Sequence, residues 1–185
     1  SAGRAVRETL PEGGEERYEY TAFGSTITET KHTNERGNVT TYRWNGQGYL
    51  VQQTDALGRV TRYERELATN LVKRRIDPTG RLTQYAYNPR GDLIRAIDPA
   101  GQQTLIEYDL RFNKPVRIED ALGNVSTMEY NSQGRISRVS NPENESTSFG
   151  YTSRGQLETV TDPLGRTSRF AYDSNGNLIE SSNAA

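Results

Sequence analysis

The chain has 185 residues and a formal net charge of −1, so no excess of charge would draw it to nucleic acid or to an acidic membrane surface. Its hydrophobic fraction of 32% is low for a globular domain, yet 11 Tyr, 4 Phe and one Trp argue against disorder. The absence of cysteine excludes disulfides and thiolate chemistry, and no apolar run is long enough to span a bilayer.

A repeat begins close to the N-terminus. Residues 1–12 read as the end of a preceding repeat, in which Leu10 to Gly13 form a closing turn. From Gly13 onward the chain aligns into eight units, each 21 to 24 residues long. The units open at Gly13, Gly37, Gly58, Gly80, Gly101, Gly123, Asn144 and Gly165. A period of this length is typical of stacked repeat proteins.

Each unit has the pattern of a β-hairpin, and the last unit shows it most completely. From Gly165 to Tyr172 the residues alternate with the period of two that marks a strand. The segment Asp173 to Gly176 follows as a turn, and the returning strand opens with Leu178. Asp and Asn hydrogen-bond their own turn backbone, and Gly accepts a positive φ, so a hairpin is predicted.

Two positions in the first strand of each unit are rich in aromatic residues. The first holds Tyr18, Tyr42, Tyr63, Tyr85, Ile106, Met128, Phe149 and Phe170. The second, two residues later, holds Tyr20, Trp44, Arg65, Tyr87, Tyr108, Tyr130, Tyr151 and Tyr172. The two positions share one strand face. They predict ladders of rings that pack on the Leu and Ile of the returning strands, with the Tyr hydroxyls reaching water.

Two kinds of turn recur. The turn inside the hairpin carries a glycine at Gly24, Gly48, Gly91, Gly134, Gly155 and Gly176, with Thr69 and Phe112 at that place in the third and fifth units. The turn that closes a unit runs between Asp55 and Gly58, Asp77 and Gly80, Asp98 and Gly101, Asp120 and Gly123, Asn141 and Asn144, and Asp162 and Gly165. The Asp is expected to accept backbone N–H groups, and the Gly to take a positive φ. Units of 22 or 24 residues are expected to absorb the additional residues as bulges or longer loops.

Few residues suggest chemistry. His32 is the only histidine, and it is expected to be a solvent-facing loop or strand residue. The Asp residues recur at one turn position, which indicates turn capping and no paired acid and base. Arginines beside the glycines, such as Arg59 and Arg166, are expected to pair with Asp between neighbouring units, with polyanion binding as the alternative. The sequence predicts no catalytic residue, no metal site and no cofactor.

The predicted fold is all-β: a solenoid-like, curved antiparallel sheet of about eight tandem hairpins with almost no helix. Residues 13–182 form the eight units and residues 183–185 a truncated closing turn, so 1–185 is expected to be a single array cut from a longer one. Both terminal strands should then have bare edges, and edge-to-edge self-association is expected. A propeller of four-stranded blades would require alternate units to differ, and no such alternation is visible.

The segment from Phe170 to Leu178, together with Asp162 to Arg166, resembles the YD repeat of Rhs proteins, of shell-forming components of insecticidal toxin complexes and of teneurins. Residues 87–93 and 130–136 are similar to it as well. The resemblance implies a long β-sheet that spirals into a hollow shell, often around a toxic C-terminal domain, in a protein that is secreted or at the bacterial cell surface. The ending that supports self-cleavage in bacterial Rhs shells is not recognisable here.

The resemblance and the repeat together favour a structural, non-enzymatic segment of a shell. The expected partners are neighbouring repeats of the parent array and an attached toxin domain, without nucleic acid or membrane. The alternative is a module for cell-surface adhesion or carbohydrate binding, in which exposed aromatic rows would stack on sugars.

Overall fold

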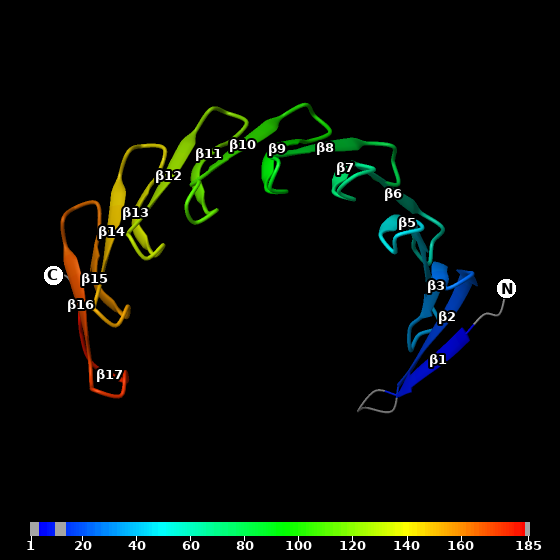
Figure 1. Ribbon diagram of the computed structural model, residues 1–185, viewed down its shortest axis with the longest axis horizontal. Coiled ribbons are helices and arrows are strands. Elements are labelled where there is room, and N and C mark those ends of the chain that lie inside the picture. Colours follow the sequence, from blue (N-terminus) through cyan, green and yellow to red (C-terminus); the bar gives the residue numbers. More distant parts are fainter. Residues whose placement is uncertain (1–3, 10–13, 184–185) are drawn as a thin grey trace. The chain divides into compact units, whose positions relative to one another are not determined.

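The computed structural model describes residues 4–9 and 14–183, and in this part of the chain every regular element is a β-strand. The predicted closing turn from Leu10 to Gly13 and the last two residues of the predicted truncated turn lie outside the described residues. The chain divides into two compact structural units, each of which contains several of the sequence repeats: the first unit is Ser1–Gln102 and the second unit is Gln103–Ala185. Each unit is a run of antiparallel hairpins in which a strand pairs with the next one in the sequence (Figure 1).

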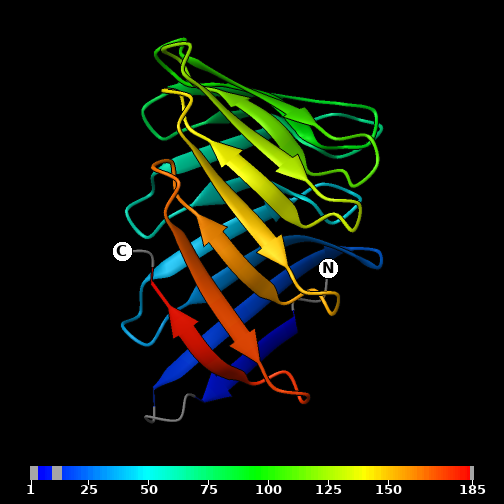
Figure 2. The ribbon, with the colours of Figure 1, turned by 90° about the vertical axis from the view of Figure 1, so that its left-hand side faces the viewer.

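The strands are short, as the repeat predicts. The first unit holds β1 (Arg4–Thr9), β2 (Glu15–Phe23), β3 (Thr26–Thr33), β4 (Val39–Trp44), β5 (Leu50–Thr54), β6 (Val60–Arg65), β7 (Val72–Ile76), β8 (Leu82–Tyr87) and β9 (Leu93–Ile97). The second holds β10 (Gln103–Tyr108), β11 (Pro115–Glu119), β12 (Val125–Tyr130), β13 (Ile136–Ser140), β14 (Ser146–Tyr151), β15 (Leu157–Thr161), β16 (Thr167–Tyr172) and β17 (Leu178–Ser182). Figure 2 shows the alternating directions of β14 to β17, from yellow to red. The prediction of an all-β fold of tandem hairpins is confirmed.

Each of the eight hairpins from β2–β3 to β16–β17 contains a register shift, which falls just before the second aromatic position in seven of them and two residues later, at Ala22, in the first. In the last one, Tyr172 lies opposite Leu178 while Ala171 lies opposite Glu180, so Ile179 is an additional residue in the returning strand. The shift recurs in the other seven hairpins of the described chain. The bulge therefore belongs to the repeat itself. Of the two expected ways of absorbing the additional residues of the longer repeats, bulges or longer loops, the longer loop is the one found in the third and fifth repeats.

The additional residues lie elsewhere. In the first hairpin they lengthen the strands, since β2 has 9 residues and β3 has 8. In the third and fifth hairpins they lengthen the turn, where the N–H groups of Asn70 and Asn113 donate to carbonyls four residues back. The residues with positive φ are consequently Asn70, at 58°, and Asn113, at 54°, and not Thr69 or Phe112. Asparagine is the residue that replaces glycine there because its side chain tolerates the left-handed region.

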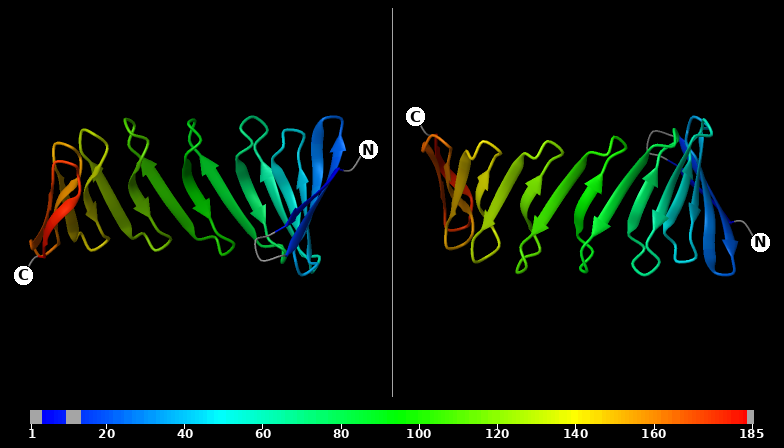
Figure 3. Two further views of the ribbon diagram at one scale, coloured as in Figure 1. Left: turned by 90° about the horizontal axis from the view of Figure 1, so that it is seen from below. Right: turned by 90° about the horizontal axis from the view of Figure 1, so that it is seen from above.

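The turns of each unit lie at the two ends of its strands (Figure 3). The glycines that open the repeats have positive φ, from 77° at Gly58 to 84° at Gly80. Asn144, which takes the place of glycine in the seventh repeat, has a φ of 63°. A left-handed residue after a tight turn brings the two strands back into pairing. Gly13, the first predicted opener, lies outside the described residues.

The sheet is one layer deep. Among the described residues no hydrophobic side chain is buried, and only Thr30 and Asn70 are, with 8% and 9% of their surface exposed. Most rings and aliphatic side chains of the strands are half-buried, whereas turn residues such as Leu57, Leu67 and Leu122 are exposed. Stability must therefore come from contacts between neighbouring hairpins, as in other repeat proteins.

Candidate functional site

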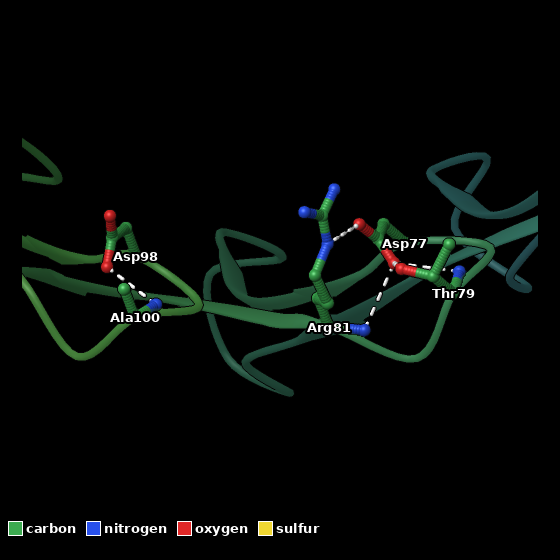
Figure 4. Close-up of polar contacts among 5 residues, drawn as sticks. All are labelled: Asp77, Thr79, Arg81, Asp98 and Ala100. Carbon is green, nitrogen blue, oxygen red and sulfur yellow. Dashed lines mark hydrogen bonds and ion pairs between the residues drawn. The ribbon is translucent and has the colours of Figure 1, made fainter.

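The closing turns repeat one hydrogen-bond arrangement, which Figure 4 shows at Asp77 and Asp98. The Asp77 Oδ1 atom accepts the backbone N–H groups of Thr79 at 2.8 Å and of Arg81 at 3.0 Å. The Asp77 carbonyl accepts the N–H of Gly80 at 2.9 Å. One carboxylate thus holds the turn, and the glycine ends it. The same pair of side-chain bonds occurs at Asp55, Asp98, Asp120 and Asp162.

Three of these turns also hold an arginine. Arg59, Arg81 and Arg166 donate to the Asp four residues earlier over 2.7 to 2.8 Å. Each pair spans a repeat boundary, so the Asp that closes one unit pairs with the Arg of the next unit as expected, and both residues lie in a single turn. Arg154 makes the link between hairpins differently, because its Nη1 atom donates to the carbonyl of Ser174 at 2.6 Å.

The donors around these carboxylates lower their pKa. The pKa values of Asp55, Asp77, Asp120 and Asp162 all lie below the ordinary value of 3.8. The largest cause is the Thr79 hydroxyl for Asp77 and the Arg166 side chain for Asp162. All these donors bind the ionised carboxylate more strongly than the neutral acid.

Acid should therefore destabilise the fold. A folded pKa below the unfolded one means that the unfolded state binds more protons, so the stability present above about pH 4 is lost as the pH falls through the folded pKa values. Urea unfolding at pH values between about 6 and 2 should show midpoints that decrease below about pH 4. Asp162→Asn keeps an acceptor, as Asn141 does in the seventh repeat, and should show a shallower decrease. An unchanged midpoint over this range would contradict the account.

In four hairpins the tyrosine at the second aromatic position links the hairpin to the preceding one. Its hydroxyl donates to the carbonyl of the residue fifteen positions earlier, which begins the returning strand of the previous hairpin. The bonds are 2.7 to 2.9 Å long and join Tyr87 to Val72, Tyr130 to Pro115, Tyr151 to Ile136 and Tyr172 to Leu157. Each of these four hydroxyls is thus engaged with a carbonyl of the preceding hairpin, and the bond at Tyr151 lies at an exposed position. The ring lies opposite the residue that opens its own returning strand, as at Tyr130 and Ile136.

Two residues depart from tyrosine and keep its role in part. The Arg65 Nε atom donates to the Leu50 carbonyl, again fifteen residues back, at 2.7 Å, and its Nη1 atom donates to the Asn70 carbonyl at 2.6 Å. The Trp44 Nε1 atom donates instead to the Thr30 hydroxyl at 3.0 Å. The arginine that interrupts the aromatic row in the sequence is thus the donor that replaces the tyrosine.

The first aromatic position lies opposite the middle of the returning strand. Phe149 pairs with Val160 and Phe170 with Ser181, so the partners vary from aliphatic to polar. At Tyr18 the partner is His32, and the two rings stack with centroids 4.6 Å apart. The remaining members, Tyr42, Tyr63, Tyr85, Ile106 and Met128, lie opposite Gln53, Arg75, Ala96, Ile118 and Val139.

His32 was expected to face the solvent from a loop or strand, but its side chain is largely covered. It lies in β3 with 22% of its side chain exposed, and its Nε2 atom is 3.1 Å from the Glu16 carboxylate. The Tyr18 hydroxyl donates to the same carboxylate at 2.9 Å, and this bond is the largest cause of the raised pKa of Tyr18. The three side chains form a local polar contact. In the described part of the chain no three His, Asp or Glu residues are grouped in a way that would hold a metal ion.

The longer turn of the fifth hairpin makes a contact that the sequence pattern missed. The Phe112 ring lies close to Gly134 in the next hairpin turn. On either side of it, Arg111 donates to the Ser132 carbonyl at 3.0 Å and Lys114 to the Gly134 carbonyl at 2.6 Å. The additional residue of this turn therefore produces a specific contact between hairpins. No helix among the described residues is long and apolar enough to cross a membrane.

The antiparallel hairpins, the capped turns and the donors that link one hairpin to the next define a tandem β-hairpin repeat protein. The profile of the RHS Repeat family matches residues 27–60, 67–103, 130–167 and 151–185, and the chain belongs to this family. No curated protein matches the sequence.

Solved structures with a similar fold belong to Tc toxins. The structure described as TcdB2-TccC3-Cdc42 has a TM-score of 0.71 at 17% identity over 92% of this chain. That described as TcdB2-TccC3-TEV has a TM-score of 0.67 at 15% identity over 97%. A Photorhabdus luminescens Tc holotoxin pore with a mutation in TccC3 has a TM-score of 0.56 at 15% identity over 96%. The chain spans 11% to 14% of the length of these solved chains, and the likeness shows the fold alone.

Proposed function

We propose that this chain is a structural segment of an RHS-repeat shell, one array over residues 1–185, that encloses or presents an attached toxin or effector domain. The observation that carries the proposal is the linkage between hairpins: a ladder of backbone bonds, reinforced by one side-chain donor to the carbonyl fifteen residues back. Such a sheet excludes macromolecules by its continuity and needs no reactive group. Secretion or display at a bacterial surface follows as part of the same proposal.

The test is limited proteolysis of the complete natural polypeptide that contains these repeats. A domain attached to the array should resist trypsin under native conditions and become sensitive when the array is opened by denaturant. Gly134→Ala, which weakens one hairpin contact, should accelerate cleavage, whereas Gln133→Ala beside it should not. A complete polypeptide without any further domain, or a domain cleaved as fast as the same domain alone, would overturn the proposal.

The exposed edge of β17 extends the proposal to self-association. All five of its residues are exposed, with Leu178 at 54% and Ile179 at 65%, and in the described chain it pairs only with β16. An unpaired strand edge with apolar side chains templates pairing with another strand.

We therefore expect the isolated chain to associate edge to edge. Sedimentation velocity should show a weight-average mass that rises with concentration, and Ile179→Lys should reduce the rise because a charge on the edge disfavours pairing. Leu164→Lys, at an exposed turn away from the edge, is the matched control. A strict monomer over a wide concentration range would contradict this part of the proposal.

A further inference from the structure

A cleft in the first unit differs from the rest of the repeat surface. It lies beside the β2–β3 turn and the β4–β5 turn and has a volume of about 560 Å³. Its lining consists of Tyr20, Ser25, Thr26, Ile27, Thr30, Trp44, Gly46, Gln47 and Gly48. The lining combines two aromatic rings, three hydroxyl side chains and one amide, and it contains no charged side chain.

The cleft exists because two neighbouring hairpins differ in length. The strands β2 and β3 have 9 and 8 residues, whereas β4 and β5 have 6 and 5. The first turn, at Gly24 and Ser25, therefore extends past the second, at Gly46 to Gly48. Gly46 and Gly48 border open space, because a Cβ atom built on either would meet nothing within 4 Å. The cleft occupies the space beside the β2–β3 turn that the shorter β4–β5 hairpin does not fill.

Trp44 is the only tryptophan of the chain, and its ring is held in place. Its Nε1 atom donates to the buried Thr30 hydroxyl at 3.0 Å, so the single polar atom of the indole is already used. The Tyr42 ring lies beside it, with centroids 6.2 Å apart. A fixed indole whose polar atom is satisfied offers the cleft an apolar face, with little loss of side-chain entropy on binding.

Gln47 is also positioned by its neighbours. Its Oε1 atom accepts from Asn70 Nδ2 at 2.5 Å, and Asn70 Oδ1 in turn accepts from Asn45 Nδ2 at 2.8 Å. Asn70 is only 9% exposed, so this chain of amides is anchored in the sheet. The bond uses the Gln47 oxygen, so the amide N–H₂ group of this lining residue is the part that can donate to a ligand.

The geometry points to a binding site for a neutral saccharide, in which a pyranose ring stacks on Trp44 and its hydroxyl groups bond to Gln47 and Thr26. A sugar ring presents C–H groups on its faces and hydroxyl groups at its rim, which matches an aromatic face bordered by hydroxyl and amide groups. The uncharged lining favours neutral over acidic sugars, because an anion would lose hydration there without gaining a cationic partner. The site is local to one step in the array, and it does not depend on the role of the chain as a wall.

The single tryptophan provides the measurement. The intrinsic fluorescence of the 185-residue chain is titrated with maltose, cellobiose, lactose and N,N′-diacetylchitobiose, and with glucuronate as the acidic comparison. At least one neutral disaccharide should change the emission in a saturable way, and glucuronate should not. Gln47→Ala should weaken the binding by about tenfold, the effect of one lost hydrogen bond. Gln133→Ala, the same turn position in another hairpin, should leave it unchanged.

Two further variants separate binding from folding. Trp44→Tyr introduces the residue that most hairpins have at this position, so the fold should persist while the saturation-transfer NMR signal of the sugar decreases. Gly46→Ser introduces the residue that three other hairpin turns carry there, and it should reduce the affinity by partly filling the cleft. The proposal is overturned if no neutral disaccharide gives a saturable change, or if Gln47→Ala binds as well as the unaltered chain.

Discussion

Replacing Arg65 by alanine is expected to lower the free energy of unfolding by about 2 kcal/mol or more, because two half-buried carbonyls lose a charged donor. These are the carbonyl of Leu50 in the preceding hairpin and the carbonyl of Asn70 in the turn of Arg65's own hairpin. The first of these bonds corresponds to the hydroxyl bond that tyrosine makes in other hairpins. The loss should appear as a lower midpoint of urea unfolding with an unchanged slope.

Arg65→Tyr is the informative companion to this variant. Tyrosine at this position should donate to Leu50 as Tyr87 does to Val72, so only the bond to Asn70 is lost and the decrease should stay near 1 kcal/mol. If Arg65→Tyr is as destabilising as Arg65→Ala, the side chain does not replace the tyrosine bond. If neither variant changes the midpoint, the link between hairpins does not contribute to stability.

Gly134→Ala should lower the free energy of unfolding by about 2 to 4 kcal/mol, because backbone strain and a steric clash with an aromatic ring add. Gly134 has a φ of 74°, where an L side chain is strained. A Cβ atom at this position would also lie 2.8 Å from the Phe112 ring, which belongs to the neighbouring turn. The ring cannot withdraw without breaking its contact with the hairpin.

Gly123→Ala separates the two causes. Its φ of 81° imposes the same strain, but nothing lies within 4 Å of a Cβ atom there. The decrease should therefore be limited to about 1 to 2 kcal/mol, measured by the same urea titration. Adding Phe112→Ala to Gly134→Ala should remove the steric part and bring the two glycine variants closer together. Equal effects of Gly134→Ala and Gly123→Ala would show that the ring contact is unimportant.

The sequence was sufficient to predict the hairpins, because their signals are local. Asp and Gly three residues apart specify the closing turn, and the alternation of residues between one turn and the next specifies the strand. The repeat period then places each hairpin beside the next. The return strands begin where the pattern predicts at Leu50, Leu93 and Ile136.

The sequence was insufficient where contacts cross from one hairpin to the next. The Tyr hydroxyl reaches a carbonyl fifteen residues earlier only because the recurrent bulge sets the register, and nothing in a single strand indicates that bulge. Arg65 looked like a defect in an aromatic row for the same reason. The longer turns carried a readable signal, since asparagine one residue beyond the expected glycine is the residue that best tolerates a positive φ. The cleft at Trp44 depends on the unequal lengths of two hairpins, which the spacing of 24 residues indicated without locating.

The claim on which the rest depends is that these repeats form paired strands without a closed core, so that protection is distributed along the chain. Amide hydrogen exchange, resolved by residue with NMR, tests it most directly. Slow amides should occur in every interior hairpin of each unit, at the ladder positions, with fast exchange confined to the turns and to the edge strands β1 and β17. Slow amides concentrated in one compact group, with most of the other strands exchanging freely, would contradict the account.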